Sequence, residues 1–419
     1  MLSLHKHALC REVLMKEKKD TGKRILFFLI GLIVRIVCGI WLKLKITKDE
    51  TVRKWQRSKD PLLILCAHPS EMDAVVLLAA SFPRYTRFVA GALQLYKPGM
   101  QSRLLNMIGV IPKKQFTPDI GAVKEMMLTV KNGDALAMMP EGRVSIDGTP
   151  SSIDISTAKL IKKLGANVAV LIPHGTFFVK PSYNYSGIIP GKMSGELKGL
   201  LHAEEITAKT ADEILDTVSK ALEYDASEEL RGSGCTYGKK ESVPMDGVSN
   251  LFYRCPSCGE LFTVSDKGGV ISCESCGLSL QAQRNMFMEC TGSGADKNAV
   301  IPDTVAGWNA LQKEWEKEFW SQPDAELVLD VRKDTMILKE ETEYTTRGNG
   351  TLRLSAAGLE YTDGEESFSV PLGAVPGVSA DYKYGHIVFY QGDIMRRFVF
   401  NDKRLTARFI NSLMTLKNI

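Results

Sequence analysis

Residues 62–75, LLILCAHPSEMDAV, constrain the fold more than any other stretch, because a fully apolar run stops abruptly at a group of polar residues. Residues 62–66 are continuously apolar and follow an Asp-Pro pair, which predicts a buried strand of a parallel sheet. His68 and Asp73 come just past the carboxyl end of that strand, where open α/β sheets place their functional groups. We therefore expect an α/β domain with a site at this edge of the sheet.

The spacing of His68 and Asp73 leaves two interpretations open. In one, Ser70 caps a helix, Asp73 is its partner in a capping box, and His68 is an ordinary loop residue. In the other, Asp73 holds the imidazole in one tautomer, so that the second ring nitrogen can take a proton from a substrate hydroxyl. The two are compatible, because a helix that starts at Ser70 presents Asp73 in its first turn, back towards His68.

A second polar group also follows an apolar strand. Residues 135–139 are predicted to form this strand, and Glu141, Gly142 and Arg143 come directly after it. The segment brings a carboxylate, a flexible glycine and a guanidinium to one strand end. If both strands belong to one parallel sheet, this group and His68 lie at the same edge.

Taken in this order and at this separation, the His-x4-Asp and Pro-Glu-Gly blocks resemble the glycerolipid acyltransferase family, the 1-acylglycerol-3-phosphate acyltransferases and their relatives. The family's Gly-x-Ile segment ending in a basic residue is matched by residues 109–114, and its hydrophobic strand by residues 168–173. The chain departs from the family at Ala67, where Asn is usual, and at residues 113–115, where Arg is usual. Its block PEGRVS looks more like the 2-acylglycerophosphoethanolamine acyltransferase branch, which leaves the acceptor headgroup open.

The resemblance implies transfer of a fatty acyl group from acyl-CoA or acyl-ACP to the free hydroxyl of a lysophospholipid, most of all 1-acylglycerol-3-phosphate, in phospholipid synthesis. A remodelling enzyme of the glycerophosphoethanolamine type and a non-catalytic membrane adaptor are the alternatives. The implied catalytic residues are His68 and Asp73, and the implied substrate-binding residues are Lys113, Lys114, Glu141, Gly142 and Arg143. No metal is required for this chemistry. A serine or cysteine hydrolase is disfavoured because no nucleophile elbow is present.

The N-terminal segment points to a lipid surface. Residues 1–60 hold 15 Lys and Arg against 6 acidic residues, in a chain whose net charge is +4. Residues 25–42 are apolar except for Arg35, which shares one helical face with two glycines. A charge at the bilayer centre costs about 3 kcal/mol or more, so we favour a helix embedded in one leaflet, with its weaker face on the catalytic domain, over a span. We expect membrane association at the cytoplasmic face and no nucleic-acid partner.

Four of the nine cysteines form two C-x-x-C pairs, and the others are scattered. This usage is typical of a reducing compartment and not of a disulfide framework. Cys255, Cys258, Cys273 and Cys276 are predicted to bind one structural zinc ion in a zinc ribbon at residues 251–280. A redox role would need one pair alone. A closed four-thiolate site leaves no position for substrate, so transfer should not depend on zinc if only a linker joins the ribbon to the catalytic domain.

The remaining pattern predicts the domain organisation. Short alternating strands followed by a helix at residues 404–416 predict a β-rich C-terminal domain that resembles the pleckstrin-homology-like superfold. The predicted divisions are a basic N-terminus with the membrane-associated helix (1–60), an acyltransferase domain with a mostly parallel sheet (61–226), a linker (227–250), the ribbon (251–280), a connecting helical region (281–322) and the C-terminal domain (323–419).

Overall fold

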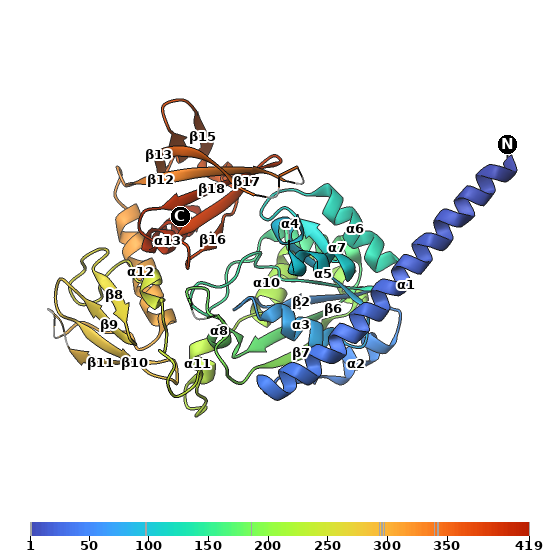
Figure 1. Ribbon diagram of the computed structural model, residues 1–419, viewed down its shortest axis with the longest axis horizontal. Coiled ribbons are helices and arrows are strands. Elements are labelled where there is room, and N and C mark those ends of the chain that lie inside the picture. Colours follow the sequence, from blue (N-terminus) through green and yellow to red (C-terminus); the bar gives the residue numbers. More distant parts are fainter. Residues whose placement is uncertain are drawn as a thin grey trace.

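Figure 1 shows the computed structural model of the chain, in which three β-sheets follow one another along the sequence. It describes residues 2–96, 99–185, 187–292, 294, 296, 298–338, 340–341 and 343–418, apart from the side chains of residues 2–20 and 418. The first sheet belongs to a mixed α/β region, the second is small, and the third forms a β-rich C-terminal region. All three regions were expected from the sequence.

The first sheet has the strand order β1-β7-β6-β2-β5-β3-β4, and its neighbours are parallel except for the pair β6 and β7. Its strands are β1 (Lys45–Lys48), β2 (Leu62–Cys66), β3 (Thr86–Gly91), β4 (Ile111–Lys113), β5 (Ala135–Met138), β6 (Asn167–His174) and β7 (Ser194–Leu201). The accompanying helices are α2 (Glu50–Arg57), α3 (Asp73–Ser81), α4 (Ala92–Tyr96), α5 (Met100–Met107), α6 (Ile120–Lys131), α7 (Ile155–Leu164), α8 (Thr176–Val179), α9 (Ala203–Ala208), α10 (Ala211–Ala221) and α11 (Ala226–Leu230).

The continuous apolar run of β2 reflects burial on both faces of the sheet. Leu62 and Ile64 contribute to the hydrophobic core on one face, and Leu63 and Leu65 to the core on the other. Because successive side chains of a strand point to opposite faces, a strand covered on both sides needs no polar residue. β2 lies between β5 and β6, so its carboxyl end opens near the middle of the sheet edge.

The sheet begins earlier than the predicted domain boundary at residue 61. β1 pairs in parallel with β7, and Val52 and Trp55 of α2 are buried in the core. β1 has four residues with an alternating polar pattern, which is too short and too basic to stand out as a core strand in the sequence. The segment after residue 42 is therefore part of the α/β region.

A single helix, α1 (Leu2–Trp41), covers the N-terminal segment, where no fold was predicted for residues 1–24. By length and composition alone, its part Thr21–Trp41 could cross a membrane. One face packs on the α/β region: the Phe27 ring is buried beside Tyr85, and Gly31 lies against Phe82. The other face exposes large apolar side chains, namely Ile25, Phe28, Leu29, Leu32, Ile33, Ile36, Val37, Ile40 and Trp41.

The second sheet has the antiparallel order β11-β10-β9-β8 and carries the cysteine pairs. Its strands are β8 (Val264–Lys267), β9 (Val270–Cys273), β10 (Ser279–Ala282) and β11 (Met288–Gly292), so it extends beyond the predicted limit at residue 280.

The predicted linker 227–250 is not an extended tether. It contains the end of α11 and part of η1 (Val248–Leu251), and it buries Tyr237 and Met245. These apolar residues are too irregularly spaced to give a periodic signal.

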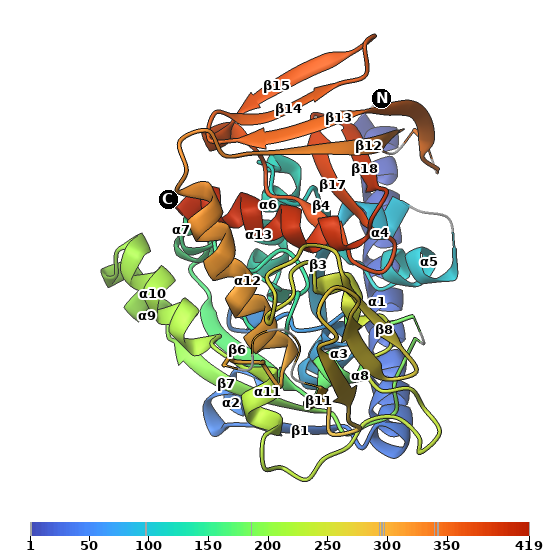
Figure 2. The same cartoon turned by 90° about the vertical axis from the view of Figure 1, so that its left-hand side faces the viewer.

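The third sheet is antiparallel, with the order β15-β14-β13-β12-β18-β17-β16. Its elements are β12 (Glu326–Ile337), β13 (Thr345–Ser355), β14 (Gly358–Thr362), β15 (Ser367–Pro371), η2 (Leu372–Ala374), β16 (Ser379–Asp381), β17 (His386–Gln391) and β18 (Ile394–Phe400), followed by α13 (Arg404–Asn418). The preceding helix α12 (Val305–Trp320) packs against α13, as Figure 2 shows. Two helices therefore lie between the ribbon and the C-terminal sheet.

Candidate active site

His68 lies just beyond β2. The backbone N–H of Ala67 donates to Leu171 O at 3.0 Å, which continues the pairing with β6 one residue past the strand. The His68 side chain is 16% exposed, and its Nδ1 lies 3.1 Å from Asp73 Oδ2. Because Nδ1 faces the carboxylate, Nε2 is the ring nitrogen left for a substrate.

Asp73 is the first residue of α3 and is fully buried. Its Oδ2 contacts His68 Nδ1 and also accepts a hydrogen bond from the Ser70 N–H at 2.7 Å. The Ser70 hydroxyl accepts from Met72 N at 3.2 Å and donates to Lys180 O at 2.8 Å. One carboxylate thus makes the contacts that both interpretations describe, although the helix starts at Asp73 and not at Ser70. Burial raises the pKa of Asp73, whereas its hydrogen bond to His68 lowers that pKa.

Glu141 joins the two polar blocks. Its side chain is almost fully buried, and Oε1 accepts a hydrogen bond from His68 N at 2.8 Å while Oε2 accepts one from Ser151 N at 2.8 Å. Burial raises the pKa of Glu141 to about 7. Since both oxygens have backbone partners, this geometry favours a positioning role for Glu141 over the direct contact with the acceptor expected from the resemblance. The hydrogen bond between Glu141 and Ser151 N joins the two ends of a loop. We call this loop, residues 140–151, the catalytic loop.

The predicted cations lie apart from this cluster. Lys113 Nζ donates to Lys114 O at 3.1 Å and to Thr117 O at 3.3 Å, and burial lowers its pKa. Lys114 Nζ forms an ion pair with Asp393, in the turn between β17 and β18 of the C-terminal sheet. Among the described residues, no hydrogen bond or ion pair joins either lysine to His68.

Arg143 lies at the boundary between the α/β region and the C-terminal region. Its guanidinium stacks over the Phe116 ring at 4.8 Å, and it interacts with the buried Tyr382 of the C-terminal region. Its Nη1 is buried without a hydrogen-bond partner in the described structure. Burial lowers the pKa of Arg143. A buried donor of this kind is suited to an anionic group, because leaving it unpaired is costly.

One further residue of this region, Gln115, was not predicted from the sequence, and it contacts the predicted Gly142. Gln115 Nε2 donates to Gly142 O at 2.8 Å, and its Oε1 accepts from Ser379 Oγ at 3.0 Å. Gly142 has φ +71°, and a side chain there would meet the Phe116 ring. Gln115 is one of the residues 113–115, where the family usually has Arg. This departure was the signal in the sequence that could have pointed to Gln115.

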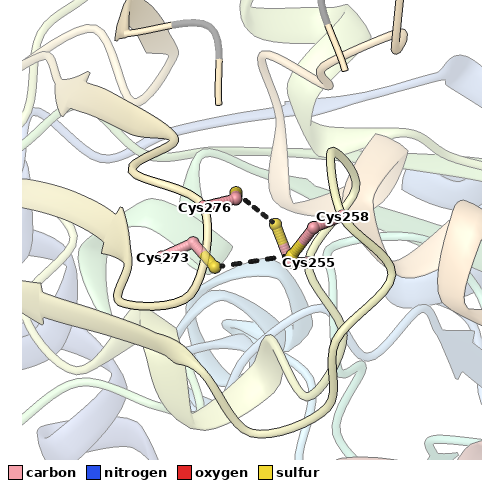
Figure 3. A group of neighbouring side chains, drawn as sticks. All are labelled: Cys255, Cys258, Cys273 and Cys276. Atoms are coloured by element: carbon pink, nitrogen blue, oxygen red, sulfur yellow. Dashed lines mark hydrogen bonds between the residues drawn. The ribbon is translucent and has the colours of Figure 1, made fainter. Parts of the chain in front are cut away.

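The four predicted zinc ligands converge, as Figure 3 shows. Their sulfur atoms all lie within 4.8 Å of one another, and the pairs Cys255–Cys276 and Cys258–Cys273 are separated by 3.8 Å. Tetrahedral zinc with Zn–S bonds of about 2.3 Å would place its sulfurs about 3.8 Å apart. The four thiols therefore fit a zinc ion.

Comparison with known proteins concerns the segment that carries both polar blocks. Residues 43–173 match the family described as Acyltransferase. Among solved structures, the chain is similar to the 1-acyl-sn-glycerophosphate (LPA) acyltransferase PlsC from Thermotoga maritima, with 19% identity, 54% of this chain and 83% of that chain covered, and a TM-score of 0.37. No curated protein matches the chain.

The chain thus carries an acyltransferase domain, and it is an acyltransferase. The matched segment begins at residue 43, close to β1, and ends in β6, so it contains both His68 and the whole catalytic loop. The family expectation drawn from the two sequence blocks is confirmed.

Proposed function

We propose that the protein transfers a fatty acyl group from an acyl thioester to the free hydroxyl of a lysophospholipid, with 1-acylglycerol-3-phosphate as the first acceptor to test. The observation that carries this proposal is the 3.1 Å contact between His68 Nδ1 and Asp73 Oδ2 at the end of β2. It leaves Nε2 as a base, and the buried carboxylate stabilises the imidazolium that forms.

In the proposed reaction, Nε2 of His68 takes the proton of the acceptor hydroxyl as its oxygen attacks the thioester carbonyl carbon. The C–S bond then breaks, and the leaving thiolate takes the proton back from the imidazolium. An ester and a free thiol result, so neither an enzyme nucleophile nor a metal is needed for this step. Glu141 acts as a positioning residue, since it holds the backbone of His68.

We assign the acceptor headgroup to the region of Lys113, Lys114, Gly142 and Arg143. Arg143 is the strongest candidate, because its Nη1 is a buried donor without a partner. A guanidinium can bind a phosphate through two parallel hydrogen bonds. A glycerophosphoethanolamine-type acceptor is the alternative that the sequence PEGRVS favours.

The decisive experiment uses the full-length protein with labelled acyl-CoA or acyl-ACP and a panel of lysophospholipids that differ in headgroup. We expect one acceptor class to be acylated by the wild-type protein and none by His68→Ala. Equal turnover in both proteins would exclude His68 as the base. Absence of transfer from either donor to any acceptor would exclude the proposed reaction.

We further propose that α1 lies in one leaflet at the cytoplasmic face. Arg24 pairs with Asp134 near the start of the apolar part Thr21–Trp41, and Lys45 N donates to Met193 O just beyond its end, so both ends of this part are held on the α/β region. A helix that crossed the bilayer could not keep both contacts. Replacing exposed Ile33 and Ile40 by Glu should release the protein from vesicles, whereas salt alone should not, because the apolar burial is not screened.

The other assignments follow the same reasoning. We propose that Cys255, Cys258, Cys273 and Cys276 bind one structural zinc ion, since their sulfurs have the required separations. We also propose that the C-terminal region adopts a pleckstrin-homology-like fold, because seven antiparallel strands are followed by one helix. Metal analysis of the full-length protein tests the first assignment, and an experimental structure tests the second.

A further inference from the structure

A buried carboxylate in the catalytic loop contacts a helix of the region beyond the ribbon. Asp147 is 2% exposed, and its Oδ2 accepts a hydrogen bond from Asn309 Nδ2 of α12 at 2.6 Å. Its Oδ1 accepts from Thr149 N at 3.0 Å and from Thr149 Oγ1 at 2.6 Å. Asn309 is itself 1% exposed. Lys313 Nζ of the same helix also lies 3.5 Å from Asp147 Oδ2. A buried charge that lost these partners would be costly, so the two contacts fix the loop against α12.

On one side, the contact leads to the zinc ribbon. Trp308 Nε1, next to Asn309, donates to Arg254 O at 3.1 Å. Gln312 Oε1, one turn along α12, accepts from Tyr253 N at 2.8 Å and from Arg254 N at 3.2 Å. Arg254 directly precedes the zinc ligand Cys255. The position of α12 is therefore set by the backbone that enters the first cysteine knuckle.

On the other side, the contact leads to the catalytic histidine. Ser145 Oγ accepts from Gly148 N at 2.9 Å, and Ser145 N donates to His68 O at 2.9 Å. Ser145 is 1% exposed. Glu141 at the start of the loop holds the N–H of the same histidine. The loop that carries Asp147 thus holds both backbone polar groups of His68.

We propose that Asp147 and Asn309 form a positioning relay, through which the zinc-bound ribbon holds the catalytic loop and hence His68 in place. The inference rests on the proposed role of His68. It also replaces the expectation that transfer is independent of zinc, because that expectation required a linker to be the sole connection. Asp147 acts through His68 and does not touch substrate.

The pair allows a swap experiment. Asn309→Asp alone places two carboxylates face to face, and Asp147→Asn alone places two amide groups donor to donor. The double variant D147N/N309D restores the pairing, because the carboxylate introduced at position 309 can accept from the amide introduced at position 147. It can also accept from Asn411 Nδ2, which donates to Asn309 Oδ1 at 2.7 Å in the wild type. Thr149 keeps an oxygen acceptor at position 147.

We expect each single variant to lower kcat by about tenfold to a hundredfold, the range for a small misplacement of a catalytic group, with smaller changes in KM. The double variant should recover most of this loss. Arg231→Ala is the matched control, because Arg231 pairs with Asp303 at 2.9 Å just before α12 but has an exposed side chain and no contact with the loop. Zinc content and thermal melting of every variant show that it is folded.

Zinc removal gives a readout that does not depend on activity. Chelation of the full-length wild-type protein should speed hydrogen exchange at the amides of Ser145 and Ser151, which donate to His68 O and Glu141 Oε2. Amides in the centre of β2, such as that of Ile64, should not change, because the sheet holds them. If the wild-type protein transfers no acyl group, the proposed function fails while the exchange experiment still tests the relay.

Each outcome of these experiments either supports or overturns the proposed relay. Loss in the single variants, recovery in the double variant and faster exchange after chelation support it. Wild-type kcat in folded, zinc-loaded single variants overturns it, and so does a folded double variant without recovery. If the single variants do not fold, the exchange experiment decides alone, and unchanged exchange at Ser145 and Ser151 after zinc removal overturns the proposal.

Discussion

The two parts of the candidate site are built differently. His68, Asp73 and Glu141 are joined by hydrogen bonds within the α/β region, at 3.1 Å and 2.8 Å. Lys114 and Arg143 instead face the C-terminal region. The part that would take the proton is therefore complete within one region, whereas the part that would bind the headgroup is shared between two.

This difference separates rate from specificity. Residues of the C-terminal region lie at two of the headgroup candidates and at the neighbouring Gln115: Asp393 pairs with Lys114, Tyr382 is beside Arg143, and Ser379 contacts Gln115. Substitutions in the first part should lower kcat for every acceptor. Those in the second part should change KM for the acceptor more than for the thioester.

The largest effect is expected from His68→Ala, which removes the base. Losing general-base assistance should lower the transfer rate by about 10² to 10⁴, with unchanged thermal melting because the side chain lies in a loop. His174→Ala is the matched control, since His174 Nδ1 also contacts a carboxylate, Glu229 Oε2, at 2.7 Å, but on a different strand end. A folded His68→Ala protein with wild-type turnover would show that the His–Asp pair is merely a capping device.

Glu141→Gln tests whether burial raises the pKa of the Glu141 carboxyl group, in the part of the site that lies within the α/β region. Burial raises the pKa of Glu141 to about 7, against about 4.3 in an unfolded chain. Between these values the folded protein keeps a proton that the unfolded chain has lost, so the free energy of unfolding falls as the pH rises through this window. The total change is at most about 4 kcal/mol. Denaturant unfolding across this window should show a slope that Glu141→Gln lacks, and equal slopes would place the carboxyl pKa elsewhere.

Arg143→Ala tests the second part. One hydrogen bond to a charged group is worth about 1.5–3 kcal/mol, so KM for a phosphate-bearing acceptor should rise by about tenfold to a hundredfold. KM for the thioester should change much less. Arg143→Lys should restore the charge but not the two-pronged geometry, and recover part of the loss. Equal effects on both substrates would indicate that Arg143 serves the domain boundary alone.

Features that depend on neighbours in the sequence could be predicted. The apolar run of β2, the contact between His68 and Asp73, and the convergence of Cys255 with the other three thiols all follow from local spacing. A strand buried on both faces needs a continuous apolar run, and a C-x-x-C knuckle presents two thiols by its own turn. A few adjacent residues are enough to determine the geometry of these elements.

Features that depend on distant partners could not be predicted. Asp393 lies 279 residues after Lys114, and Asn309 lies 162 residues after Asp147. Nothing in the local pattern of an acidic loop residue shows that it is buried against a helix of another region. The same holds for Tyr237 in the predicted linker, whose ring packs against Phe178 at 5.2 Å. These contacts form only when the regions of the folded chain pack against one another.

The smallest effect is expected at the ion pair between Lys114 and Asp393, where the C-terminal region meets the headgroup candidates. The Asp393 side chain is 75% exposed and that of Lys114 is 26% exposed, so solvent screens the pair. Such pairs contribute about 0.2–1 kcal/mol, and Asp393→Asn should leave thermal melting almost unchanged. Because it frees the ammonium group of Lys114 for an anion, it should lower KM for a phosphate-bearing acceptor by up to about fivefold, and this gain should shrink at high salt. Asp381→Asn, in β16 of the same sheet, is the control, as its Oδ1 accepts from Tyr384 N and not from a cation. An unchanged KM in Asp393→Asn would confine the headgroup site to Arg143 and leave Lys114 as a docking residue for the C-terminal sheet.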